Sequence, residues 1–206
     1  MSICEQIGWT GDSEITFLLM LSVILLGGCG FFAISLQSAN AENKLFKTIL
    51  YADTQVVEVS VDSQKALDYY TEASFAYEKA DYPGVESNCR LARGYFLSVG
   101  SKYKNIEAEL EAKDMKDSLI DIYINELKLL AEIQLNLYEA CEHFESAARY
   151  YNTYYKTNVP ANDPSYDMGT KSIESMNEKI DLHDENIRKY NNLLADYKIE
   201  LEKRIE

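Results

Sequence analysis

The hydrophobic and polar positions divide this chain into one unbroken apolar run and a long region with helical periodicity. Residues 15–36 contain no charged side chain. At a rise of ~1.5 Å per residue, a helix of that length spans the ~30 Å hydrocarbon core of a bilayer. We therefore predict a transmembrane helix at residues 15–36, after an N-terminal tail at 1–14 and before a linker at 37–61. Val56, Val57 and Val59 in the linker suit a short strand, but a lone strand would be unstable.

Two apolar faces with helical spacing follow from Asp62 onward. The first face comprises Ala66, Tyr69, Tyr70, Ala73, Ala76, Tyr77 and Ala80. The second comprises Val85, Cys89, Ala92, Phe96 and Val99. Pro83 suits the first turn of a helix, where its missing N–H costs nothing, and Gly100 suits a left-handed C-terminal cap. We predict a helical hairpin region at residues 62–116, with a turn at residues 81–84 and a helix end at Gly100.

Part of this region resembles the two-helix hairpin of a tetratricopeptide repeat. The resemblance covers residues 66–99 and is carried by Tyr70, Ala73, Tyr77, Asp81, Tyr82, Val85, Cys89 and Ala92. A weaker echo follows one period later, where residues 112–115 parallel residues 79–82. Ala80 and Val85 depart from the family's glycine and alanine, and convergent packing of two helices explains the same residues. The resemblance implies a helical solenoid that binds other proteins.

Residues 117–206 carry two heptad patterns that predict a long antiparallel helical pair. In the first helix, which Asp117 or Ser118 can cap, only Glu126 breaks the apolar seam. Its two seam positions hold Leu119, Glu126, Ile133, Ala140, Ala147 and Tyr154, and Tyr123, Leu130, Leu137, Phe144 and Tyr151. The last helix repeats the scheme with Ile173, Ile180, Ile187, Leu194 and Leu201 against Met176, His183, Tyr190, Tyr197 and Arg204. The alternative is that this C-terminal helix forms a homo-oligomer seam with another copy of the chain.

Composition agrees with an all-α protein that is acidic. The chain has only three prolines and nine glycines, so it offers few turns. It carries 34 acidic and 20 basic residues, a net charge of −14. Such a balance argues against nucleic acid, or an anionic lipid surface, as the main partner, because both need clustered Lys and Arg.

The N-terminal apolar run has three interpretations. The absence of Lys and Arg from residues 1–14 favours an uncleaved signal-anchor, because a secretory signal normally begins with a positive segment. Cleavage after Ala41, or lipidation of Cys29, are the alternatives. Lys44 and Lys47 on the C-terminal flank predict a single-pass protein of the cell membrane with a cytoplasmic soluble domain. On the other side of the membrane, Cys89 and Cys141 could pair as a disulfide.

The sequence shows no pattern typical of catalysis, cofactor binding or metal binding. His143 and His183 lie in no zinc or di-iron motif, and the cysteines lack Cys-x-x-Cys spacing. His183 falls on the apolar seam, where we expect a hydrogen-bonded interior histidine. We therefore expect no enzyme activity, no cofactor and no metal site.

Tyrosine is the compositional oddity of this chain, with 16 residues. Tyr150, Tyr151, Tyr154 and Tyr155 cover more than one face of their helix, and aromatic residues with a polar tip are enriched at protein interfaces. They are our candidate interaction patch, although packing on the preceding hairpin is an alternative. The sequence thus favours a membrane-anchored helical interaction or scaffold protein with unknown protein partners. The alternative is an accessory subunit of a larger membrane complex.

Overall fold

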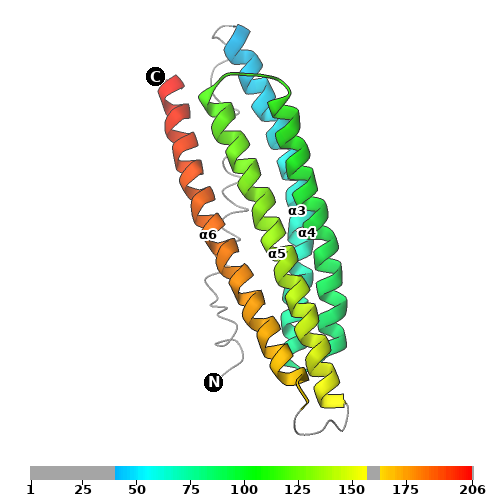
Figure 1. Cartoon of the computed structure of the whole chain (residues 1–206). Helices are drawn as coiled ribbons and strands as arrows, with labels where there is room; N and C mark the ends of the chain where they lie inside the picture. Colours follow the sequence, from blue (N-terminus) through cyan, green and yellow to red (C-terminus); the bar gives the residue numbers. More distant parts are fainter. Residues whose placement is uncertain (1–39, 157–162, 206) are drawn as a thin grey trace.

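The computed structural model describes residues 40–156 and 163–205, and these residues form an all-α bundle of four helices (Figure 1). They are α3 (Asn40–Glu78), α4 (Tyr82–Glu111), α5 (Ser118–Lys156) and α6 (Ser165–Ile205). Successive helices run antiparallel. The upper end of the bundle in Figure 1 holds the start of α3, the α4–α5 turn and the end of α6, and the lower end holds the α3–α4 turn, the end of α5 and the start of α6.

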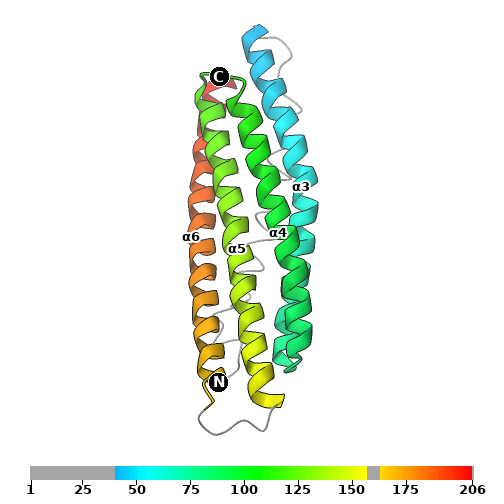
Figure 2. The same cartoon turned by 45° about the vertical axis from the view of Figure 1, so that its right-hand side comes forward.

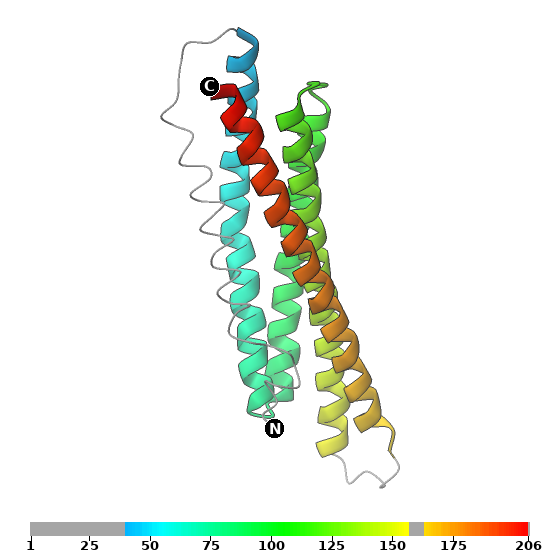
Figure 3. The same cartoon turned by 90° about the vertical axis from the view of Figure 1, so that its left-hand side faces the viewer.

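The helices pack mainly on their neighbours in the chain. The order α3, α4, α5, α6 is also the order in which the helices contact one another, so α3 and α6 are the two edges (Figures 1 and 2). Viewed from the side, α6 crosses the other helices obliquely, from the lower end of α5 toward α3 at the upper end (Figure 3). Two hydrophobic cores, one above the other, nevertheless draw residues from all four helices.

An aspartate caps the helix that follows each of the three chain reversals, and the predicted cap at Asp117 is confirmed. The Asp81 carboxylate accepts a hydrogen bond from the Gly84 N–H (3.2 Å), and Pro83 lies in the first turn of α4. The Asp117 carboxylate accepts from the Leu119 N–H at 2.9 Å, and the Asp163 carboxylate accepts from the Ser165 N–H at 2.7 Å. Each cap supplies an acceptor for an N–H that has no partner within its helix.

The linker prediction for residues 37–61 is wrong from residue 40 onward, because α3 begins at Asn40. Val56 and Val59 lie in this helix and not in a strand, which agrees with the expected instability of a lone strand. The reason is periodicity: the buried positions recur every three or four residues, and burial outweighs the small helix penalty of β-branched side chains. These buried residues are Leu45, Ile49, Ala52, Val56 and Val59.

The predicted helix end at Gly100 is also wrong, since α4 continues to Glu111. Gly100 is buried against α5, where an added Cβ would lie 3.5 Å from the Gln134 Cβ and 3.6 Å from the Ala131 carbonyl oxygen. The absence of a side chain at Gly100 allows α4 and α5 to pack closely together. Left-handed backbone occurs instead at Ala80 and Asp114, just beyond the ends of α3 and α4.

The heptad pattern of residues 117–206 is confirmed as an antiparallel pair, α5 and α6. Apart from Tyr154, which is half-buried, every predicted seam residue of α5 is buried. On α6 the seam residues Met176, Ile187 and Tyr190 are buried and the others are half-buried, as expected for an edge helix. The last helix therefore packs within its own chain.

The structure bears on only one of two predictions about the N-terminal part, the tetratricopeptide-like hairpin and the membrane span. Residues 66–99 do form a helical hairpin, but α3 alone has 39 residues, longer than a whole tetratricopeptide repeat of about 34, so the structure gives no evidence for that repeat. The predicted tail and membrane span, residues 1–36, lie outside the described residues. Among the described helices, none has an apolar stretch sufficient to cross a bilayer.

Candidate functional site

The lower end of the bundle carries a cluster of tyrosine rings to which all four helices contribute. We define this tyrosine cluster as Tyr77, Tyr82, Tyr151, Tyr154, Tyr155 and Tyr166. Tyr82 of α4 stacks on Tyr155 of α5 with ring centroids 6.0 Å apart and planes inclined by 3°. Tyr166 of α6 lies 5.6 Å from Tyr151 and 5.3 Å from Tyr154. Such ring pairs add stability beyond the area they bury, so the cluster ties the helix ends together.

The four residues of the predicted patch have different environments. Tyr151 is buried, Tyr150 and Tyr154 are half-buried, and Tyr155 is 61% exposed. The structure thus places Tyr151 in the packing and Tyr155 on the surface. Sequence reasoning missed Tyr166, which is also exposed, because only the reversal of the chain after α5 brings it beside Tyr154.

A glycine of α6 fixes the central ring of the cluster. A Cβ at Gly169 would lie 2.7 Å from the Tyr151 ring, closer than side chains tolerate, so α6 can reach this ring only without one. The Tyr151 hydroxyl also lies 3.2 Å from the Thr170 hydroxyl. Burial raises the pKa of the Tyr77 and Tyr82 phenols, so both stay neutral at physiological pH. The end therefore presents neutral rings with hydroxyl groups, which suits contact with another protein.

A buried polar centre in the upper core is the second unusual feature. Glu126, which interrupts the heptad seam, is only 5% exposed, and its Oε1 has no hydrogen-bond partner. Across from it, the Tyr123 hydroxyl donates a hydrogen bond of 2.6 Å to the Asp53 carboxylate of α3. Sequence reasoning identified Glu126 as irregular but had no signal for Asp53, which lies in the misassigned linker.

Burial and the neighbouring carboxylate control the protonation of this centre. Loss of solvation, with a smaller repulsion from Asp53, raises the pKa of Glu126 to about 8. Burial also raises the pKa of Asp53, although the hydrogen bond from Tyr123 opposes this. At pH 7 Glu126 is therefore mostly a neutral carboxylic acid. It holds a proton between helices in the interior of the bundle.

A charged network joins α4 to α5 beside the lower core. Glu145 is buried, and Arg93 approaches its carboxylate to 2.9 Å while also donating to the Tyr138 hydroxyl at 2.9 Å. Arg149 pairs with the same carboxylate one turn along α5. A buried carboxylate that loses its cationic partners destabilises the fold, so these ion pairs favour one alignment of α4 and α5.

Cys89 and Cys141 are buried in the same core as free thiols. Burial, together with a hydrogen bond to Cys89, raises the pKa of Cys141 far above its usual range, so this thiol is a poor nucleophile. His183 is half-buried, with its Nδ1 2.9 Å from the Asp184 carboxylate. His143 is half-buried on α5.

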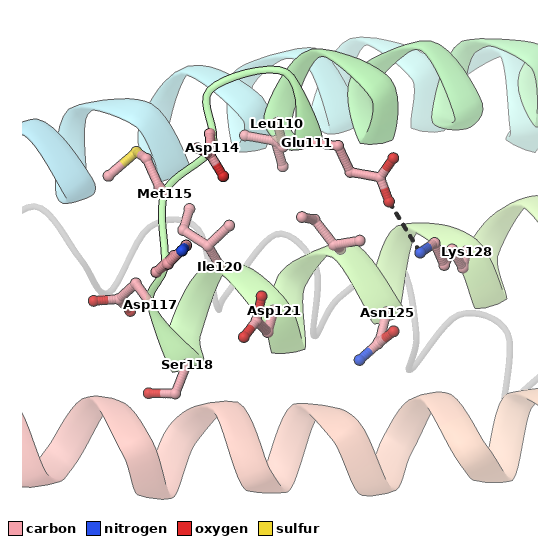
Figure 4. Close-up of a pocket in the computed structure, with 12 residues that line it drawn as sticks. Leu110, Glu111, Asp114, Met115, Asp117, Ser118, Ile120, Asp121, Asn125 and Lys128 are labelled. Carbon is pink, nitrogen blue, oxygen red and sulfur yellow. Dashed lines mark hydrogen bonds and ion pairs between the residues drawn. The ribbon is translucent and has the colours of Figure 1, made fainter.

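An acidic groove of about 630 Å³ lies at the α4–α5 turn (Figure 4). Asp114, Asp117 and Asp121 line it with Glu111, whose carboxylate pairs with Lys128 at 3.1 Å. Asp117 is further held by Arg204 of α6 at 2.8 Å. In the region that the structure describes, no group of three or more His, Cys, Asp or Glu residues is arranged to hold a metal ion. Two of the groove's carboxylates have structural roles: Asp117 caps α5 and pairs with Arg204, and Glu111 pairs with Lys128.

Comparison with known proteins returned no match, whether with family models, with curated proteins or with solved structures.

Proposed function

We propose that this chain is a membrane-anchored helical interaction or scaffold protein that acts by binding rather than by catalysis. The observation that carries the proposal is the tyrosine cluster at the lower end of the bundle. The start of α3, which comes soon after the apolar run 15–36 in the sequence, lies at the opposite end. Tyr155, Tyr166 and Met168 are exposed there. Partly exposed aromatic and methionine side chains are enriched at the centres of protein interfaces.

The shape of the bundle supports a scaffold role. α5 has 39 residues, so at ~1.5 Å per residue it extends roughly 60 Å between the two ends. If residues 15–36 anchor the chain in the membrane, as we propose, the tyrosine cluster is held away from the bilayer on a stiff rod. Lys44 and Lys47 support a cytoplasmic location for this rod.

Site-specific photocrosslinking of the full-length chain in cells tests the proposal. A photoreactive residue at position 155 should capture a discrete partner, which mass spectrometry identifies. The matched control is position 97 in the middle of α4, where the leucine is similarly exposed at 55%. Capture from 97 but not from 155 would contradict the proposed contact surface.

The alternative function, an accessory subunit of a larger membrane complex, gives a different pattern in the same experiment. A span that packs inside a complex should crosslink from positions within residues 15–36 rather than from position 155. N-terminal sequencing of the mature protein tests the anchor itself. A start at Glu42, or a lipidated Cys29, would refute an uncleaved membrane helix.

A further inference from the structure

A second groove, of about 340 Å³, lies at the upper end of the bundle and is lined by lysines. Lys44 and Lys47 reach it from the first turns of α3, and Lys113 reaches it from the α4–α5 turn. Asn43 and the buried Thr48 complete the lining. We call these five residues the lysine groove. All its charged residues are basic, although the chain as a whole carries a net charge of −14.

The three ammonium groups of the lysine groove form no ion pair with a carboxylate of the described residues. Some lysines elsewhere in the bundle pair with acids, as Lys102 does with Asp62 at 2.7 Å, whereas others, such as Lys79 and Lys156, stand singly without an ion pair in the described residues. Within the described residues, Lys44, Lys47 and Lys113 take part in no ion pair. Lys113 is held instead over the ring of Tyr51, with its Nζ 5.5 Å from the ring centroid. Three unneutralised cations around one hollow leave a local positive charge that a bound anion would balance.

The lysines are not explained by the stability of α3. A cation near a helix N-terminus faces the positive end of the helix dipole, so Lys44 does not help α3 to form. All three side chains are exposed and contribute little to the core. The groove offers ammonium groups with a hydroxyl and an amide, which suits the several oxygens of a phosphate group.

The position of the lysine groove indicates where that phosphate comes from. Leu36 ends the apolar run, four residues before α3 begins and eight before Lys44. At ~3.5 Å per extended residue and ~1.5 Å per helical residue, the groove lies within about 20 Å of the end of the run. With the run embedded in a bilayer, this distance places the groove in reach of the lipid headgroups.

We propose that the lysine groove binds the phosphate-bearing headgroup of an anionic phospholipid. This inference rests on the proposed membrane anchor. It differs from the expectation from net charge, which argues against an anionic lipid surface as the main partner. Folding brings Lys113 beside two lysines more than 60 positions earlier in the chain, a clustering that composition cannot reveal. Juxtamembrane lysines near anionic lipid each strengthen binding by about fivefold.

The test titrates the full-length, detergent-solubilised chain with soluble short-chain phospholipids and counts bound lipid by native mass spectrometry. The probes are dihexanoyl phosphatidylserine, dihexanoyl phosphatidylcholine and inorganic phosphate. The groove variant replaces Lys44, Lys47 and Lys113 by glutamine. The control variant makes the same change of charge at three exposed lysines of the lower end, Lys79, Lys156 and Lys171.

We expect the groove variant to bind phosphatidylserine about 100-fold more weakly than the natural chain, and the control variant to be unaffected. Phosphatidylcholine should bind weakly to all three proteins. Equal phosphatidylserine affinity in the groove and control variants would overturn the proposal. Inorganic phosphate that binds the natural chain as tightly as phosphatidylserine would overturn the assignment to a lipid. Circular dichroism checks the fold, and Lys47→Gln alone should give a smaller loss if the triple variant is unstable.

A separate measurement keeps the anchor distinct from the lysine groove. Flotation of the natural chain with neutral phosphatidylcholine vesicles in 1 M salt reports on the apolar run, because lysine–phosphate attraction is screened under those conditions. A chain that fails to float refutes the anchor. The phosphatidylserine titration still tests the groove, whose residues all lie after position 42.

Discussion

Replacing Glu126 by glutamine should stabilise the bundle, and by more as the pH rises. The glutamate is buried with an unpaired Oε1, so its ionised form is strongly disfavoured in the folded chain. Because its pKa is raised from 4.5 to about 8, the folded state binds a proton that the unfolded chain releases above pH 4.5. The contribution of Glu126 to the free energy of unfolding is therefore fully present below pH 4.5 and is lost as the pH rises through 8.

The size of the effect follows from these two pKa values. At 1.36 kcal/mol per pKa unit, the difference between 4.5 and about 8 corresponds to roughly 5 kcal/mol once Glu126 is fully ionised. At pH 7 the loss is roughly 3 kcal/mol, and at pH 5 it is below about 1 kcal/mol. Glutamine cannot ionise, so the variant should lack most of this decline. Asp53, whose pKa is also raised, adds a smaller decline that both proteins retain.

Urea unfolding of residues 40–206, followed by circular dichroism at pH 5, 7 and 9, measures the effect. We expect the free energy of unfolding of the natural fragment to fall by about 4 kcal/mol between pH 5 and pH 9 through Glu126, and that of Glu126→Gln to show only the smaller decline from Asp53. The control is Glu174→Gln on α6, where the glutamate is exposed. The reasoning is refuted if Glu126→Gln shows the same decline with pH as the natural fragment.

Four further substitutions test the packing. Gly169→Ala should lower the free energy of unfolding by about 1–3 kcal/mol, since its Cβ would meet a tyrosine ring. Gly94→Ala, whose Cβ would meet nothing within 4 Å, should raise it by about 0.5–1 kcal/mol, and thermal unfolding compares the pair. Arg93→Ala should lower the free energy of unfolding in urea by about 3 kcal/mol, because the buried Glu145 carboxylate loses a cationic partner. An unchanged urea midpoint would contradict the role of this network. Ile187→Ala should cost about 2–5 kcal/mol without changing the sedimentation coefficient; a dimer lost on substitution would instead indicate a seam between copies.

The fold could be predicted where one periodic signal dominated. Along α5 the apolar residues recur with a heptad spacing over the whole helix, and the structure buries nearly all of them. At the start of α3 two signals competed. Val56, Val57 and Val59 have high β propensity, which hid the helical spacing of Leu45, Ile49 and Ala52. Tertiary burial decides such segments, and no short window of sequence contains it.

The candidate sites were harder to predict because their residues are distant in sequence. The tyrosines of α5 lie on successive turns of one helix and are close together in the sequence. Tyr82 and Tyr166 come beside them only through two chain reversals. Asp53 and Tyr123 lie 70 residues apart and meet through one hydrogen bond. Glu126 was visible as a polar interruption, yet its environment depends on where α3 lies. Local patterns thus identify single unusual residues, and the fold determines their neighbours.

The packing of each helix mainly on the next one also bears on how the chain folds. α4 can dock on α3, α5 on α4 and α6 on α5 in the order in which a ribosome would release them, because each new helix contacts the one just made. Only a short turn must close at each step, so little loop entropy is lost before native contacts form. Chains with such local contacts fold within microseconds to milliseconds. Assembly from the N-terminal side would leave α6 as the last helix to join and as the first to detach under stress.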